Sequence, residues 1–224
     1  MLQRKWKGTL QIVRPELPFA AGVCVVLGEI VALGGFPPLR EAFLGFVCGF
    51  FISASAIVLN DYFDLEVDRV NSPGRPLPAG LMTPPDAIWL TIATGGIGLA
   101  AAFLLSVPAF LLCAFFWSIG CLYNWKFKEA GLVGNLMVSA NVGFTFILGG
   151  MAVGQPWDGI VWCFALMAFF VDLGEEIAGD AMDIEGDKKR GSRSIAIHKG
   201  REFALRISRV LFSLVLLISW IPFR

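Results

Sequence analysis

The sequence predicts an all-α fold, a polytopic membrane helical bundle, from three observations. Of the 224 residues, 56% are hydrophobic and 16% are charged, and the mean hydropathy is +0.71. A soluble domain has about 45–50% apolar and about 25% charged residues. The apolar residues fall into long runs separated by short polar patches, and the basic residues gather on alternate connections. This pattern is typical of α-helices that cross a bilayer.

Most of the apolar stretches reach the roughly 20 residues that a helix needs to cross a bilayer. We expect seven transmembrane helices, the second of which extends into its polar flank. A short break at 106–108 separates the third stretch from the fourth, and the polar run 155–158 separates the fifth from the sixth. The seven stretches are 17–35, 42–59, 86–106, 108–124, 131–153, 159–178 and 203–222.

The basic residues predict the orientation of the bundle, because cytoplasmic loops carry an excess of Lys and Arg. With the N-terminus in the cytoplasm, 16 basic residues fall on the inner side and only Arg40 and Arg224 on the outer side. Three long or polar inner segments, 60–85, 123–130 and 179–201, are then able to meet at one membrane face. The inner basic residues are Arg4, Lys5, Lys7, Arg14, Arg69, Arg75, Lys126, Lys128, Lys188, Lys189, Arg190, Arg193, Lys199, Arg201, Arg206 and Arg209.

The first inner segment carries a stripe of acidic residues. Asp61, Asp64 and Asp68 are spaced i, i+3, i+7, and Asn60 begins the same stripe. On a helix this spacing places all of them on one face over two turns. Like charges at this spacing repel one another, and more strongly in the lower dielectric of a membrane surface. The stripe therefore indicates a bound cation.

The second acidic stripe lies in the third inner segment. Glu176, Asp180, Asp183 and Asp187 are spaced i, i+4, i+7, i+11, again a single helical face, three turns long. The alternative interpretation, that the acids are solvated helix ends, explains one such run better than two runs beside basic loops on one side. Mg²⁺ binds one or two carboxylates together with waters and substrate phosphates. The two stripes therefore predict a magnesium site.

Basic residues flank both stripes, and a diphosphate needs cationic donors. For any one of these residues, the positive-inside pattern is also a sufficient explanation. Tyr123, five residues before Lys128, is either an interface anchor or part of the site. The flanking residues are Arg69, Arg75, Lys126, Lys128, Lys188, Lys189, Arg190 and Arg193, and Arg14 lies similarly just before the first span.

The net charge and the cysteines bear on possible partners and metal sites. The formal net charge is zero, so no nucleic-acid partner is expected. The cysteines sit singly inside apolar runs without metal-ligand spacing, which indicates small buried side chains. They are Cys24, Cys48, Cys113, Cys121 and Cys163.

The segment 60–68, with the pattern Asn-Asp-x-x-Asp-x-x-x-Asp, resembles the first signature of the UbiA superfamily of intramembrane prenyltransferases. Glu176, Asp183 and Asp187 resemble its second signature, with Glu176 where Asp is common. The stretch 123–128 is similar to the short Tyr/Lys motif between the two signatures. The resemblance extends over the whole chain.

The resemblance implies a prenyltransferase and assigns roles to residues. Mg²⁺ between the acidic segments would hold a prenyl diphosphate, while Lys128, Tyr123 and Arg69 act on the leaving group. The implied metal-binding residues are Asn60, Asp61, Asp64, Asp68, Glu176, Asp180, Asp183 and Asp187. The implied substrate-binding residues are Arg14, Asn60, Arg75, Lys126, Lys128, Asn135, Lys188, Arg190 and Arg193.

The acceptor is less closely specified by the motifs. The stretch 186–197 is most similar to the branch of the family that adds a second geranylgeranyl group in archaeal ether-lipid synthesis, which implies geranylgeranylglyceryl phosphate as the acceptor. An aromatic quinone or pigment precursor is the alternative within the family. An ion-coupled membrane transporter is the alternative of another class, although transporters place ionisable residues near the bilayer midplane and these carboxylates cluster at helix ends.

The sequence departs from the family pattern in two places. Glu16 and Leu17 stand where members often carry Asn, shortly after the first Arg-Pro pair. The family usually has nine spans around a central cavity open to the cytoplasmic side, whereas seven are visible here. We therefore expect 1–224 to form a single transmembrane prenyltransferase domain that lacks its C-terminal spans. It would be a multi-pass cell-membrane protein, surrounded by membrane lipids, with its active site facing the cytoplasm.

Overall fold

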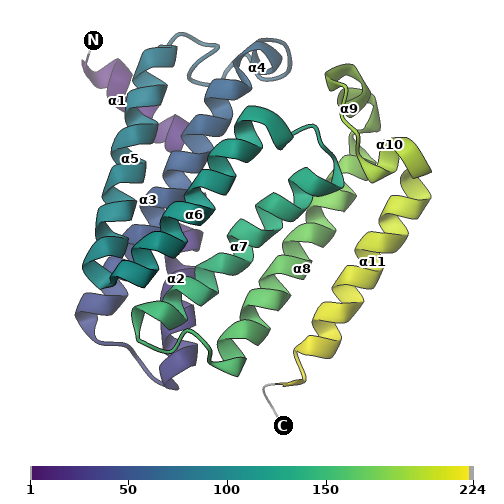
Figure 1. The fold of residues 1–224 in the computed structure, drawn as a ribbon. Helices are drawn as coiled ribbons and strands as arrows, with labels where there is room; N and C mark the ends of the chain where they lie inside the picture. The colour runs from purple at the N-terminus through teal and green to yellow at the C-terminus, as the bar shows by residue number, and fades with distance from the viewer. Residues whose placement is uncertain (1, 222–224) are drawn as a thin grey trace.

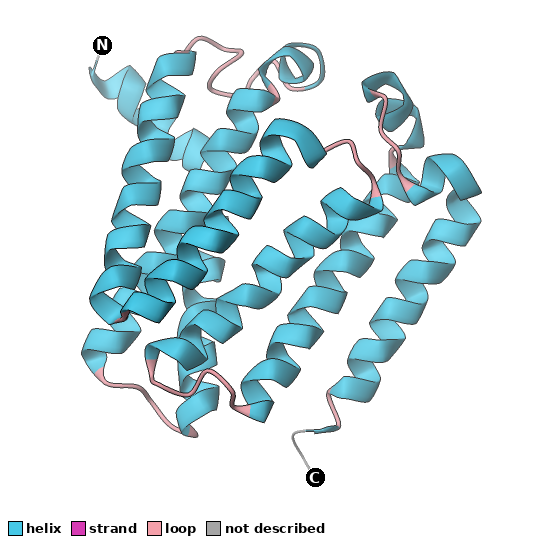
Figure 2. Ribbon diagram, in the orientation of Figure 1, coloured by secondary structure: helices cyan, strands magenta, loops and turns pink. Residues whose placement is uncertain are grey.

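The computed structural model describes residues 2–221, and every regular element in that range is helical (Figures 1 and 2). The long helices follow the predicted apolar stretches closely, and α3 extends into the polar flank as expected. The long helices are α2 (Glu16–Leu33), α3 (Leu39–Phe63), α5 (Pro84–Leu105), α6 (Val107–Leu122), α7 (Leu132–Ala152), α8 (Gly159–Met182) and α11 (Arg201–Ile218). The shorter elements are α1 (Leu2–Val13), α4 (Leu65–Asn71), the π-helical turn η1 (Tyr123–Phe127), α9 (Ile184–Arg190) and α10 (Ile195–Lys199).

Within residues 2–221, five helical segments are long and apolar enough to cross a membrane. They are α2, α3, α5, α7 and the continuous segment Val107–Phe127, which joins α6 to η1. In α8 and α11, by contrast, every 18-residue window carries more than two charged residues. The multi-pass character of the chain is thus established by five helices, and the count of seven spans stays a prediction.

The helices pack through small residues, as is usual for helices in membranes. At the crossing of α2 and α7, a Cβ atom on Gly149 would lie 2.1 Å from the carbonyl oxygen of Val25, so only glycine permits this approach. The main apolar core lies between α2, α3, α5, α6 and α7, where Phe116 stacks on Phe144 with ring centroids 4.3 Å apart. A second apolar cluster joins α8 to α10 and α11.

The short helices gather at one end of the bundle. Figure 1 shows α1, α4, α9 and α10 at the same end, and the C-terminal end of α11 at the other. The connection from η1 to α7 is bound to the connection from α9 to α10. Gly131 has φ +61, and a Cβ atom there would lie 2.1 Å from the carbonyl oxygen of Arg193. The backbone N–H of Arg193 also donates to the carbonyl oxygen of Glu129, 3.0 Å away.

Candidate active site

The three inner segments expected from the basic residues meet at this end of the bundle. Lys128, which follows η1, pairs with Asp64 at the end of α3. The same ammonium group interacts electrostatically with Glu176 in α8. Lys128 therefore joins the segments 60–85 and 123–130 to the end of α8, and the bond from Arg193 to Glu129 joins 179–201 to 123–130.

The first acidic stripe is not a single uninterrupted helical face, as the spacing predicted. Helix α3 ends at Phe63 and α4 begins at Leu65, with Asp64 between them at φ −83 and ψ 0. The three aspartates of the stripe pair with cations outside it, Asp61 with Arg14, Asp64 with Lys128 and Asp68 with Arg75. Helical spacing alone does not encode these partners.

The partners are specific. Asp61, which is almost fully buried, pairs with Arg14, from the turn between α1 and α2. Asp68, also buried, accepts a hydrogen bond from Arg75 at 2.6 Å, and Arg75 lies 3.6 Å from Asp61. Partial burial by itself lowers the pKa of Arg75, but the hydrogen bond that Arg75 donates to Asp68 and the neighbouring carboxylates outweigh burial and raise that pKa. Arg75 thus stays charged.

Asn60 connects the first stripe to the motif around Tyr123. Its carboxamide nitrogen, in the orientation that satisfies both amide atoms, donates to Asp64 at 3.0 Å while the oxygen accepts from Lys128 at 2.9 Å. Asn124 lies 3.1 Å from the same amide and is anchored by its own bond to the carbonyl oxygen of Gly120. The π-helical turn presents Asn124 and Tyr123 here, and such turns are frequent at functional sites.

The second acidic stripe is also broken at its middle residue. Helix α8 ends at Met182, Asp183 adopts φ −115 and ψ 34, and α9 begins at Ile184. The predicted three-turn helical face is therefore wrong in the same way as the first. Its contacts are with α7: Asn135 donates to Asp180 at 2.9 Å, which joins two residues of the predicted site. Asp187 is buried in α9.

An acid that the sequence analysis missed extends this stripe into the bundle. Asp172 lies one helical turn before Glu176 and accepts a hydrogen bond from Ser139 of α7 at 2.8 Å. The signal was present in the sequence, because a carboxylate inside an apolar stretch is rare without a role. Asn124, within the fourth apolar stretch, is a second polar residue that the same signal would have found.

Several of the basic residues lie apart from the acidic cluster. Arg69 is exposed and pairs with Glu66 at 2.9 Å, and Lys188 lies 3.6 Å from Glu185 on the exposed side of α9. Lys126 and Arg193 are also exposed. The side chain of Arg190 lies outside the part of the chain whose side chains are described. The structure therefore brings together Arg14, Arg75 and Lys128, and leaves Arg69, Lys126, Lys188 and Arg193 exposed.

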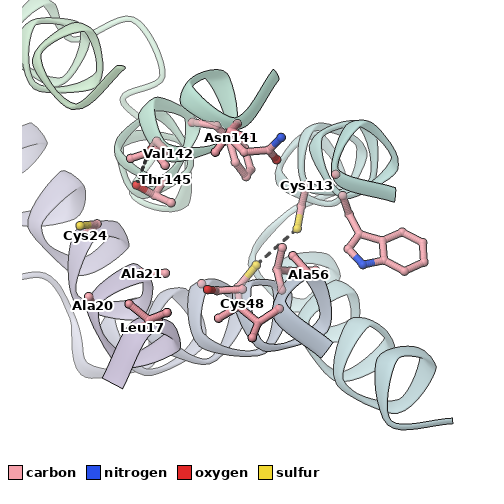
Figure 3. A pocket seen from close by; sticks show the side chains of 18 of the residues that line it. Leu17, Ala20, Ala21, Cys24, Cys48, Ala56, Cys113, Asn141, Val142 and Thr145 are labelled. Carbon is pink, nitrogen blue, oxygen red and sulfur yellow. Dashed lines mark hydrogen bonds between the residues drawn. The ribbon is translucent and has the colours of Figure 1, made fainter. Parts of the chain in front are cut away.

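A cavity of about 540 Å³ opens beneath this cluster, between α2, α3, α6 and α7. Arg14, Asn60, Tyr123 and Asn124 line its polar end. The remainder is mostly apolar, and Cys48 and Cys113 lie deep within it with their sulfur atoms 3.5 Å apart (Figure 3). A charged mouth above an apolar cavity fits a ligand with an anionic head and a hydrocarbon tail.

The family model described as the UbiA prenyltransferase family matches residues 21–224. The chain belongs to this family and is a prenyltransferase.

Among its curated relatives, the digeranylgeranylglyceryl phosphate synthase of Thermococcus kodakarensis is 36% identical over 220 residues, which cover 98% of this chain and 79% of the relative. The synthase of the same name from Pyrococcus furiosus is 36% identical and covers 96% of this chain and 77% of that protein.

Solved structures share the fold. One described as a digeranylgeranylglyceryl phosphate synthase superposes with a TM-score of 0.84 at 28% identity and covers 98% of this chain and 77% of that chain. A UbiA homologue from Archaeoglobus fulgidus, bound to DMAPP and Mg²⁺, has a TM-score of 0.74 at 24% identity, with 94% and 75% coverage. At that identity the second likeness concerns the fold alone.

Proposed function

We propose that this prenyltransferase moves a geranylgeranyl group from geranylgeranyl diphosphate to geranylgeranylglyceryl phosphate, with Mg²⁺, in archaeal ether-lipid synthesis. The single observation that carries the proposal is the position of Lys128. It pairs with Asp64 of the first acidic segment and interacts electrostatically with Glu176 of the second, beside Asn60 at the polar end of the apolar cavity. The names of the relatives at about 36% identity supply the acceptor and the chain length.

The donor set of the site fits magnesium that arrives with a substrate. Among residues 2–221, no group of three or more His, Cys, Asp or Glu side chains forms a ready-made metal cage. Mg²⁺ usually takes one or two carboxylates and completes its shell with waters and phosphate oxygens. Bound there, it would neutralise charge on the diphosphate. The residues that would hold it are Asn60, Asp61, Asp64, Asp68, Glu176, Asp180, Asp183 and Asp187.

The chain's own cations serve the leaving group in this proposal. Lys128 exchanges its bond with Asp64 for one with the diphosphate and stabilises the charge that develops as the allylic C–O bond breaks. Arg14 and Arg75 keep the neighbouring carboxylates in place, and the Tyr123 ring lines the cavity beside the reacting carbon. The apolar walls below exclude water from the carbocation.

The basic residues around the cluster are assigned to the phosphate of the acceptor and to the approach of the diphosphate. Lys188, Arg190 and Arg193 flank the second acidic segment, and Arg69 and Lys126 flank the first segment and η1. We propose that Asn135, through its bond to Asp180, holds the second segment against α7. We also propose that this end of the bundle faces the cytoplasm and that 1–224 acts as one domain with seven spans.

The test of the activity is magnesium-dependent release of diphosphate from geranylgeranyl diphosphate by the purified protein, with acceptors added one at a time. The proposal expects an ether product with geranylgeranylglyceryl phosphate and none when EDTA replaces Mg²⁺. Efficient use of 4-hydroxybenzoate in place of the glyceryl phosphate would remove the ether-lipid assignment and favour an aromatic acceptor. Absence of diphosphate release with every acceptor would contradict the proposal as a whole.

The sidedness is tested separately by labelling with an impermeant thiol reagent. Single cysteines at Ser72, Glu129 and Ser192, in a background without the native cysteines, should react only from the cytoplasmic side. Labelling of the Ser72 and Ser192 positions from opposite sides would exclude a common site.

A further inference from the structure

The apolar part of the cavity contains a pair of hydrogen-bonding side chains on two different walls. Asn141 of α7 and Ser53 of α3 both line it, among mainly aliphatic and small residues. The Asn141 amide nitrogen donates to the carbonyl oxygen of Met137, one turn earlier, at 2.9 Å. This bond fixes the amide, and Figure 3 shows the side chain projecting from α7 toward α6, on which Cys113 lies.

The remaining polar atoms of the pair lack partners within the described part of the chain. There the amide oxygen of Asn141 and the hydroxyl of Ser53 make no hydrogen bond, and both residues are only half-buried because they border the cavity. A polar group that faces an apolar space costs free energy unless a ligand or water bonds it. Two such groups in one cavity indicate a ligand with a polar atom at that level.

Both side chains lie at a similar depth below the charged end. Asn141 comes six residues after Asn135, which bonds Asp180, so it lies about 9 Å along α7 from that contact at 1.5 Å per residue. Ser53 comes seven residues before Asn60, which corresponds to about 10 Å along α3. This level is below the carboxylates and cations, so a prenyl diphosphate held by them would place its allylic carbon on the side of the cavity that faces Asn141 and Ser53.

The chemistry of the pair is complementary to an alcohol. An amide oxygen accepts one hydrogen bond, and a serine hydroxyl donates one. An alcohol donates through its hydrogen and accepts through its oxygen, so it satisfies both walls at once. A nucleophilic aromatic carbon would use neither group.

We propose that Asn141 and Ser53 are positioning residues that hold the hydroxyl of an aliphatic alcohol acceptor against the allylic carbon of the prenyl diphosphate. In the reaction, the bond between C1 and the diphosphate oxygen breaks, and its electron pair leaves with the diphosphate. A lone pair of the held hydroxyl forms the new C–O bond, and the hydroxyl proton passes to the departing diphosphate. This inference rests on the proposed function, and it deepens that function by assigning an alcohol rather than an aromatic ring as the acceptor.

The test separates ionisation of the prenyl diphosphate from capture of the cation. Purified protein is given radiolabelled geranylgeranyl diphosphate, Mg²⁺ and geranylgeranylglyceryl phosphate, and the ether product, free geranylgeraniol and diphosphate are quantified together. Asn141→Leu keeps the approximate volume of the side chain and removes its polar atoms. We expect the ether product to fall roughly tenfold to a hundredfold, while diphosphate release persists and geranylgeraniol, the product of water capture, rises.

Ser53 offers a matched pair of variants, because threonine and valine have the same shape and differ in the hydroxyl group. Ser53→Thr should keep the product ratio of the parent, and Ser53→Val should shift it toward geranylgeraniol. Val133→Ile, at an exposed position of α7 that does not line the cavity, is the control and should leave the ratio unchanged.

Each outcome has one meaning. An unchanged product ratio in Asn141→Leu, or equal ratios in the two Ser53 variants, would overturn the inference and leave the proposed function intact. Equal loss of diphosphate release and ether product in Asn141→Leu would also overturn it, since the amide would then act on the prenyl donor. A parent protein that releases no diphosphate would overturn both proposals.

Discussion

The two acidic segments of this protein hold their carboxylates by different kinds of contact. In the first, Asp61 and Asp68 are buried against the guanidinium groups of Arg14 and Arg75. In the second, Asp172 and Asp180 are held on α7 by a hydroxyl and a carboxamide, which carry no charge. Lys128 stands between the segments, paired with Asp64 and close to Glu176.

The two segments are therefore held in place by different contacts. Ion pairs neutralise charge as well as fix geometry, so the carboxylates of the first segment are already held in place by the chain's own cations. The hydroxyl of Ser139 and the amide of Asn135 fix Asp172 and Asp180 of the second segment against α7. We therefore expect the arrangement of the first segment to depend on its ion pairs and that of the second on its contacts with α7, and Lys128 to report on both segments.

The largest effects should follow from removing one carboxylate at the break in either segment. Asp64→Ala and Asp183→Ala should each lower magnesium-dependent turnover by about a thousandfold or more, because each removes a proposed metal ligand, and Asp64→Ala also removes the partner of Lys128. Product formation at saturating Mg²⁺ is the measurement. Glu66→Ala, which removes an exposed acid paired with Arg69, is the control and should behave like the parent. Full activity in either site variant would refute the two-segment metal site.

Removal of the shared cation should be the next largest effect. Lys128→Met preserves much of the side-chain length and removes the charge, so turnover should fall about a hundredfold to a thousandfold, the cost of losing one preorganised group at the leaving charge. The control is Lys199→Met, which removes an exposed cation of α10 to which no role in the site is assigned. The measurement is the turnover of each variant in steady-state kinetics with geranylgeranyl diphosphate varied. Equal turnover of the two variants would show that the charge of Lys128 is not needed at the leaving group.

The acceptor side should respond to a smaller change. Arg grips a phosphate with two parallel hydrogen bonds that Lys cannot reproduce. Arg193→Lys should therefore weaken the apparent affinity for the glyceryl phosphate acceptor by about 1.5–3 kcal/mol, roughly tenfold to a hundredfold, and affect the prenyl donor less. The kinetics are measured with each substrate varied in turn. An equal loss of apparent affinity for both substrates would indicate that Arg193 binds the diphosphate. No change in either affinity would indicate that Arg193 contributes only to the positive-inside orientation.

The ion pair between Arg14 and Asp61 in the first segment predicts an effect on the free energy of unfolding. Arg14→Gln leaves the buried carboxylate of Asp61 without its closest cation. Since Arg14 is partly exposed and Arg75 remains nearby, we expect a loss of about 1–2 kcal/mol. The measurement is thermal unfolding in detergent. The control is Arg69→Gln, which breaks an exposed ion pair and should lower the free energy of unfolding by about 0–1 kcal/mol. A larger shift of Tm in the control would contradict the comparison.

The sequence by itself determined the elements that depend on local composition. Helix-length apolar runs predicted the long helices to within a few residues at most ends, because a chain segment that crosses a bilayer must satisfy its backbone internally. The spacing of acids along 60–68 and 176–187 identified the two segments, since neighbours three and four residues apart share a helical face. The sequence also predicted roles for Arg14, Tyr123, Lys128 and Asn135, and the structure places each of them beside an acidic segment or the polar end of the cavity.

Only the tertiary structure decided how these residues meet. Arg14 reaches Asp61 across 47 positions of the chain, and Lys128 reaches Asp64 across 64, and no local pattern encodes such pairs. The pair between Lys128 and Asp64 lies at the break in the first segment, and helical periodicity predicted neither that break nor the one at Asp183. The inward direction of Asp172 and Asn141 likewise follows from which face of α7 and α8 the other helices cover. Periodicity fixes which residues share a face, whereas the packing of distant helices fixes what that face contacts.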